Sequence, residues 1–122
     1  MTPTLAHAPI HESETSLAGA SRAMTVERFD PDAPGTPPAV VLLHGADGLR
    51  YRGPVYRAMA RHMAGQGLRV LLPHYFERTG TQGHASAARP MDFLGWMDAI
   101  DSAVGSAGPG PVGLVGISLG RT

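Results

Sequence analysis

The 122-residue sequence has no cysteine and no lysine, and its formal net charge is zero. Without cysteine, a chain can form no disulfide framework, no thiolate nucleophile and no cysteine-based metal site. A neutral chain also has no field that attracts nucleic acid or an anionic membrane. We therefore expect no nucleic-acid partner, no metal and no other cofactor.

Long apolar stretches are also missing. No run approaches the roughly 18 apolar residues of a membrane-spanning helix, and the N-terminus lacks the basic and then apolar order of a secretory signal. The hydrophobic content of 43% is that of a globular protein. These features predict a cytoplasmic protein that does not associate with membranes, and they leave the oligomeric state open.

The N-terminal part carries little periodic signal. Residues 1–21 show no sustained apolar period of 2 or 3.6 residues, so we predict a disordered tail there. Residues 23–29 alternate loosely between apolar and polar types, which predicts an edge strand. The remainder, residues 22–122, is predicted to form one domain.

Short apolar runs alternate with amphipathic helices from residue 39 onward. The runs at 39–43, 70–72 and 112–115 predict buried strands, because continuous apolar runs suit strands that are covered on both faces. Helices are predicted from Pro54 to Gly65 and from Pro90 onward. This order predicts an α/β fold with a parallel sheet flanked by helices.

The predicted core-facing stripe of each helix follows from helical spacing. The first helix has Val55, Met59 and Met63, with Tyr56 and Ala60 beside them; the second has Phe93, Met97, Ile100 and Val104.

The last apolar run leads directly into Gly116-Ile117-Ser118-Leu119-Gly120. A strand followed by G-x-S-x-G is the pattern of a nucleophile elbow, where a tight turn projects the serine Oγ above the sheet edge. Flanking glycines are needed because side chains there would collide with the neighbouring strand and helix. A plain turn is the alternative, since the pentapeptide can arise by chance, but the preceding strand favours the elbow.

A serine nucleophile needs a base that takes its proton and fixed N–H donors that stabilise the oxyanion. In the elbow geometry one donor is the backbone N–H of Leu119, and the other comes from the loop after the central strand. Ala46 is the predicted second donor, because Gly45 lets the backbone turn toward the site. His44 is not assigned as the base, because in this architecture the base follows the nucleophile in the chain.

Three segments together resemble an α/β-hydrolase, and the dienelactone hydrolase family is the nearest branch. They are VLLHGADGL at 41–49, GLRVLLP at 67–73 and GISLG at 116–120. The similarity runs from about residue 24 to 120, the front half of such a domain. The resemblance implies a partial α/β-hydrolase fold with the C-terminal half missing, so that residues 22–122 are an incomplete domain ending at the elbow.

The resemblance also implies roles for single residues. Ser118 is the implied nucleophile, Ala46 and Leu119 are the implied oxyanion donors, and a small-molecule ester or lactone is the implied substrate. Arg78 lies where the family has a substrate-binding arginine, so we predict that its planar guanidinium holds a substrate carboxylate. The alternative is a surface ion pair with Glu77.

Two departures from the family limit the expected activity. Dienelactone hydrolases proper use a cysteine where Ser118 stands, so their thiolate switch cannot operate here. The family's catalytic acid and base both follow the nucleophile, and only Arg121 and Thr122 follow the elbow. We therefore expect a serine-dependent ester or lactone hydrolase whose truncated 122-residue chain is inactive by itself. The alternative is a non-catalytic α/β module that binds a ligand or a partner.

Overall fold

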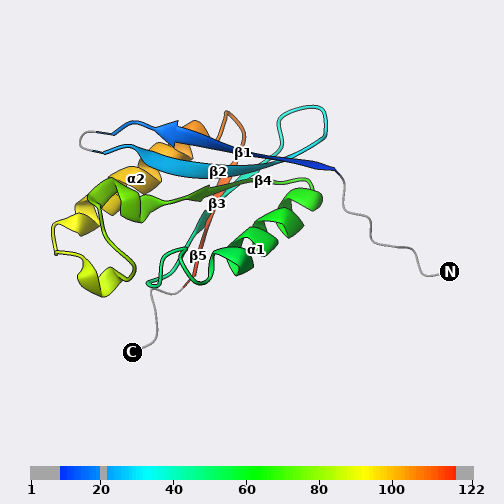
Figure 1. Cartoon of the computed structure of the whole chain (residues 1–122). Helices are drawn as coiled ribbons and strands as arrows, with labels where there is room; N and C mark the ends of the chain where they lie inside the picture. The colour runs from blue at the N-terminus through cyan, green and yellow to red at the C-terminus, as the bar shows by residue number, and fades with distance from the viewer. Residues whose placement is uncertain (1–8, 20–21, 118–122) are drawn as a thin grey trace.

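The computed structural model describes residues 9–19 and 22–117. These residues form one five-stranded mixed sheet with two α-helices (Figure 1). The strands are β1 (Ile10–Leu17), β2 (Met24–Pro31), β3 (Ala39–Leu43), β4 (Arg69–Pro73) and β5 (Val112–Gly116). The helices are α1 (Gly53–Gly65) and α2 (Asp92–Ser106), with short 3-10 helices η1 (Tyr75–Thr79) and η2 (Ala85–Ala87).

The parallel part of the sheet confirms the prediction from the sequence. In the strand order β1-β2-β4-β3-β5, β3 pairs in parallel with both β4 and β5. Parallel neighbours need a crossover connection, which α1 provides between β3 and β4 and α2 provides between β4 and β5. Within the described sheet, β5 is an outer strand that pairs with β3 alone.

Two predictions for the N-terminal part are wrong. Residues 10–17 form the strand β1, which pairs antiparallel with β2, rather than part of a disordered tail. As a result β2 is an interior strand, because its other side pairs antiparallel with β4. Hydrophobic periodicity could not reveal β1, because its six central residues are polar and exposed. The other residues of the predicted tail, 1–8 and 20–21, lie outside the described ranges.

The sheet separates two apolar clusters, one under each helix. Neighbouring residues of β3 point to opposite faces, so Val41 belongs to the cluster under α2 and Leu42 to the cluster under α1. The largest fully buried side chain of the α1 cluster is Phe29 of β2, and the α2 cluster includes Trp96. Both faces of the central strands are therefore covered, as parallel strands require.

The buried face of each helix coincides only in part with the predicted stripe, since Tyr56 and Ala60 of α1 are buried whereas Val55 is exposed. The buried side chains are Tyr56, Ala60 and Ala64 in α1 and Trp96, Ala99 and Ala103 in α2. Small alanines let a helix approach the sheet closely, which explains why they face it rather than the larger residues. Val55, Phe93 and Met97 of the predicted stripes are instead exposed.

Candidate functional site

The carboxyl ends of β3 and β5 lie side by side at one edge of the sheet. The Ile117 N–H donates to the Leu43 carbonyl at 3.1 Å, so the residue that follows β5 is tied to the end of β3. This places the loop at 44–48 beside the point where the chain continues to Ser118. Ser118 and Leu119 themselves fall outside the described ranges, and their roles as nucleophile and oxyanion donor stay predictions.

Hydrogen bonds with two tyrosines hold the loop that follows β3. The Gly45 N–H donates to the Tyr56 Oη of α1 at 2.8 Å, and the Tyr75 hydroxyl of η1 donates to the His44 carbonyl at 2.7 Å. Gly48 closes a turn with its N–H on the Gly45 carbonyl, and its φ of 67° is a conformation that favours glycine. Sequence reasoning missed both tyrosines, because their contacts with the loop are long-range.

In the same loop, the backbone N–H of Ala46 stays unused. Ala46 is 3% exposed, and its carbonyl accepts from the Ala85 N–H at 2.8 Å. In the part of the chain that the structure describes, the Ala46 N–H makes no hydrogen bond. Most buried backbone N–H groups are paired, so a free one at this sheet edge can serve a ligand.

His44 is buried inside the site as a neutral imidazole. Its ring stacks on Tyr75 with 4.1 Å between the centroids, and its Nδ1–H donates to the Gly45 carbonyl at 2.8 Å. Burial lowers the pKa of His44 from the ordinary 6.5 to about 4, against a smaller opposing effect of the bond to Gly45. A nitrogen of such low basicity holds a proton poorly, which supports leaving His44 out of the base role.

The buried His44 predicts a loss of stability in acid. Its pKa is lower in the folded state than in the unfolded state, so protons bind the unfolded chain more tightly. The contribution of neutral His44 to the free energy of unfolding is complete above pH 6.5 and is lost as the pH falls toward 4. At pH 4.5 the loss is about 2.5 kcal/mol. We expect His44→Gln to show a correspondingly smaller loss between pH 7.5 and pH 4.5 in urea denaturation. An equal loss in both proteins would contradict this assignment.

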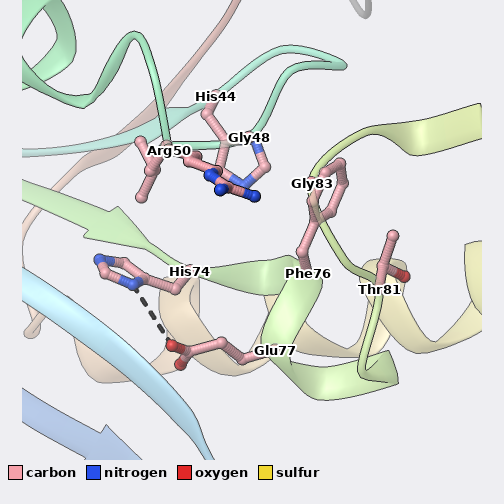
Figure 2. Close-up of a pocket in the computed structure, with 9 residues that line it drawn as sticks. His44, Gly48, Arg50, His74, Phe76, Glu77, Thr81 and Gly83 are labelled. Atoms are coloured by element: carbon pink, nitrogen blue, oxygen red, sulfur yellow. Dashed lines mark ion pairs between the residues drawn. The ribbon is translucent and has the colours of Figure 1, made fainter. Parts of the chain in front are cut away.

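A cavity of about 140 Å³ lies between the loop after β3 and the segment after β4 (Figure 2). Its charged and polar lining includes Arg50, Glu77 and Thr81. Figure 2 shows Arg50 on the loop after β3, opposite His74 and Glu77, which follow β4. Arg50 has no carboxylate partner among the described residues, and its guanidinium lies 5.4 Å from the Tyr51 ring centroid. The sequence analysis missed Arg50, since no motif marks it.

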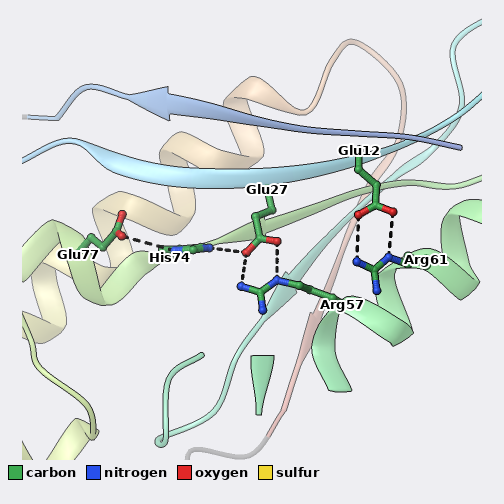
Figure 3. A network of polar contacts seen from close by, with 6 residues as sticks. All are labelled: Glu12, Glu27, Arg57, Arg61, His74 and Glu77. Atoms are coloured by element: carbon green, nitrogen blue, oxygen red, sulfur yellow. Dashed lines mark hydrogen bonds and ion pairs between the residues drawn. The ribbon is translucent and has the colours of Figure 1, made fainter. Parts of the chain in front are cut away.

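His74 and Glu77 of this cavity belong to a polar network with Glu27 and Arg57 (Figure 3). Glu27 accepts two hydrogen bonds from Arg57, at 2.8 and 2.9 Å, and one from the Nε2–H of His74 at 2.6 Å. Burial alone would raise the pKa of Glu27, but the bonds from Arg57 and His74 outweigh it and lower the pKa. His74 Nδ1 also lies 3.5 Å from Glu77 Oε2, so both of its ring nitrogens face carboxylates. The network joins β2, α1 and η1.

Arg78 does not line this cavity. Its side chain is buried and pairs with Asp98 of α2 at 2.9 Å, rather than with Glu77. Its Nε and Nη2 atoms are buried and have no hydrogen-bond partner in the described ranges. The predicted contact between Arg78 and a substrate carboxylate stays a prediction.

The described ranges contain no helix that is both long and apolar enough to cross a membrane. They also contain no group of three or more histidine, cysteine, aspartate or glutamate residues arranged to hold a metal ion.

Comparisons with known proteins identify the fold. No protein-family model matches the sequence, and no curated protein matches it. Among solved structures, a dienelactone hydrolase candidate from Klebsiella pneumoniae has a TM-score of 0.66 and 20% identity, over 89% of this chain and 50% of that chain. A dienelactone-hydrolase-like promiscuous phosphotriesterase from metagenomic libraries has a TM-score of 0.64 and 18% identity, over 91% and 50%.

A third structure extends the likeness beyond the dienelactone hydrolases. Brefeldin A esterase, a bacterial homologue of human hormone-sensitive lipase, has a TM-score of 0.60 and 22% identity, over 97% of this chain and 33% of that chain. The chain spans at most about half the length of these three structures. It therefore has the fold of part of an α/β-hydrolase domain, like that of dienelactone-hydrolase-like proteins and other esterases.

Proposed function

We propose that this chain forms the nucleophile-bearing part of a cytoplasmic serine hydrolase that cleaves an ester, a lactone or a similar acyl bond. In this proposal the Ser118 Oγ attacks the acyl carbonyl, and the backbone N–H groups of Ala46 and Leu119 stabilise the oxyanion. The histidine base and its carboxylate partner come from polypeptide beyond residue 122. The substrate is a small molecule.

The free Ala46 N–H is the observation that carries the proposal. Two other donors of the loop are occupied, since the Gly45 N–H donates to the Tyr56 hydroxyl and the Gly48 N–H donates to the Gly45 carbonyl. A buried N–H without an acceptor is unfavourable by about 1–3 kcal/mol, and a developing oxyanion would relieve that cost. The tyrosine bonds fix the loop before any substrate arrives, which is the preorganisation that oxyanion stabilisation requires.

Two guanidinium groups are available for a substrate that also carries a carboxylate. Arg78 is the predicted ligand, and it would have to leave Asp98 to reach such a group. Arg50 already lines the cavity beside the loop after β3 and has no carboxylate partner among the described residues. For such a substrate, we therefore add Arg50 to Arg78 as a proposed carboxylate ligand.

The alternative function is a non-catalytic module that binds a ligand or a partner. This alternative is favoured because, within the described ranges, no histidine near the site combines sufficient basicity with a free nitrogen, as a general base requires. The coding sequence that follows codon 122 separates the two functions. A further strand followed by an aspartate and a histidine supports the hydrolase, and their absence supports the binding module.

The hydrolase proposal predicts a strong effect of Ser118→Ala in the reading frame extended through those residues. We expect the extended protein to hydrolyse p-nitrophenyl acetate, and the substitution to lower kcat at least about 10³-fold, because the nucleophile is lost. Ser13→Ala, at an exposed position of β1, is the matched control and should leave the rate unchanged. Turnover that survives Ser118→Ala would refute the proposed nucleophile.

A further inference from the structure

The peptide unit that joins His44 to Gly45 is held at both of its polar ends. Its carbonyl accepts from the hydroxyl of Tyr75 at 2.7 Å. Its N–H donates to the hydroxyl of Tyr56 at 2.8 Å. Tyr56 lies on α1 and Tyr75 on η1, and both side chains are buried. Two tyrosines from different elements therefore hold a single peptide unit, and we name them the tyrosine clamp.

The next peptide unit joins Gly45 to Ala46 and carries the N–H that is unpaired within the described ranges. Its carbonyl accepts from the His44 Nδ1–H at 2.8 Å and from the Gly48 N–H at 3.0 Å, so both of its lone pairs are used. The described residues contain no cis peptide bond. In a planar trans unit the carbonyl and the N–H point in opposite directions. Fixing this carbonyl therefore also fixes the direction of the Ala46 N–H.

Tyr75 also orients the imidazole that donates to this carbonyl. The rings of Tyr75 and His44 are stacked, with 4.1 Å between their centroids and 6° between their planes. Phe76 meets the same imidazole edge-on, with 4.6 Å between the centroids. Tyr75 is itself packed against Trp96 of the α2 cluster, with 5.7 Å between the centroids. The direction of the His44 Nδ1–H therefore depends on a ring that is anchored in the core.

The donor role of Tyr75 is maintained at the pH of an esterase assay. Burial, together with the nearby Tyr56, raises the pKa of the Tyr75 hydroxyl to about 12. The phenol is therefore protonated at pH 7.5 and can donate to the His44 carbonyl. The clamp and the two peptide units that it holds are buried within the described ranges, so these contacts do not depend on an exposed surface.

We propose that Tyr75 and Tyr56 are positioning residues for the oxyanion donor, and that the clamp directs the Ala46 N–H toward the oxyanion. This role rests on the proposed hydrolase function and is exerted through His44 and the backbone. The oxyanion develops only in the transition state, so loss of the clamp should lower kcat and leave KM unchanged. A misplacement of about 1 Å can lower a rate about 100-fold.

The first measurement is amide hydrogen exchange of the 122-residue chain, followed by mass spectrometry in segments 44–48 and 69–73. Tyr75→Phe keeps the stacked ring and removes only the hydroxyl. We expect exchange in 44–48 to become at least about tenfold faster without a matching change in β4. Tyr51→Phe is the matched control, because Tyr51 is 75% exposed. Unchanged exchange of 44–48 in Tyr75→Phe, or an equal rise in both segments, would overturn the proposal.

The second measurement is catalysis by the reading frame extended through the acid and the base, with p-nitrophenyl acetate as substrate. Tyr75→Phe, and independently Tyr56→Phe, should lower kcat about 10- to 100-fold and leave KM within about twofold. Tyr51→Phe should change neither constant. Unchanged kcat in both clamp variants, or a change confined to KM, would overturn the positioning role and leave the hydrolase function intact. An extended protein without Ser118-dependent turnover would instead refute the proposed function, and the catalytic role of the clamp with it.

Discussion

The 122-residue chain is expected to hydrolyse p-nitrophenyl acetate no faster than its Ser118→Ala variant. A serine hydroxyl becomes a useful nucleophile only when a positioned base takes its proton. Such a base needs a free nitrogen lone pair and a pKa near the working pH. No histidine near the carboxyl edge of the described sheet combines these two properties.

Each histidine near this edge is unsuited to act as the general base, and the reason differs from one to the next. The pKa of His44 is about 4, so the ring is a weak base although its Nε2 has no partner in the part of the chain described. His74 faces Glu27 with one nitrogen and Glu77 with the other. In His84, Nδ1 accepts from the Ser86 N–H at 2.9 Å and Nε2 lies 3.5 Å from Asp47.

The assay compares the initial rates of the chain and of Ser118→Ala at pH 7.5, each corrected for the rate in buffer. A clear loss of turnover in the variant would show that a base exists within these residues. His44→Gln and His74→Gln would then identify it, since only the substitution of the true base should abolish the remaining rate.

The central strands and the crossover helices could be predicted because their signals are local. Continuous apolar runs such as 39–43 occur where a parallel strand is covered on both faces, and proline followed by a helical stripe marks where α1 begins. β1 gave no such signal. Its polar residues are held by backbone pairing with β2 and by contacts such as the ion pair of Glu12 with Arg61 at 2.9 Å.

The apolar stripes of the helices show a second limit of prediction from the sequence. Spacing reveals which residues share a side of α2, but not whether that side is covered. Phe93 and Met97 share a side and are exposed, whereas the core uses Ala99 and Ala103. Burial depends on neighbours from distant parts of the chain, and the local spacing of apolar residues cannot predict those contacts.

For the candidate site, the sequence predicted the position of the loop at 44–48, but it did not predict the side chains that hold or surround this loop. The residues after β3 were identified as a source of an oxyanion donor, and the structure shows that the Ala46 N–H is free within the described ranges. The contribution of Tyr56 and Tyr75 depends on the way α1 and η1 fold against that loop. The pairing of Arg78 with Asp98 likewise needs α2 beside η1, a tertiary contact that spacing cannot predict.

The isolated chain is expected to be marginally stable and to associate. Four of the five residues of β5 are exposed, and among the described strands β5 pairs only with β3. An apolar outer strand offers unpaired backbone groups to other chains. The exposed Leu114 adds an apolar side chain at the same place. We expect a free energy of unfolding below about 5 kcal/mol and concentration-dependent association in light scattering.

A single charge on β5 should reduce the association if this strand causes it. Leu114→Arg places a cation on the exposed outer strand, which natural sheets use against edge-to-edge pairing. Val55→Arg is the matched control, because Val55 is an equally exposed apolar residue on α1, away from β5. We expect the monomer fraction to rise several-fold in Leu114→Arg and to stay unchanged in Val55→Arg. A soluble monomer of the unaltered chain, with one cooperative urea transition of about 5 kcal/mol or more, would contradict this expectation and favour a self-sufficient binding module.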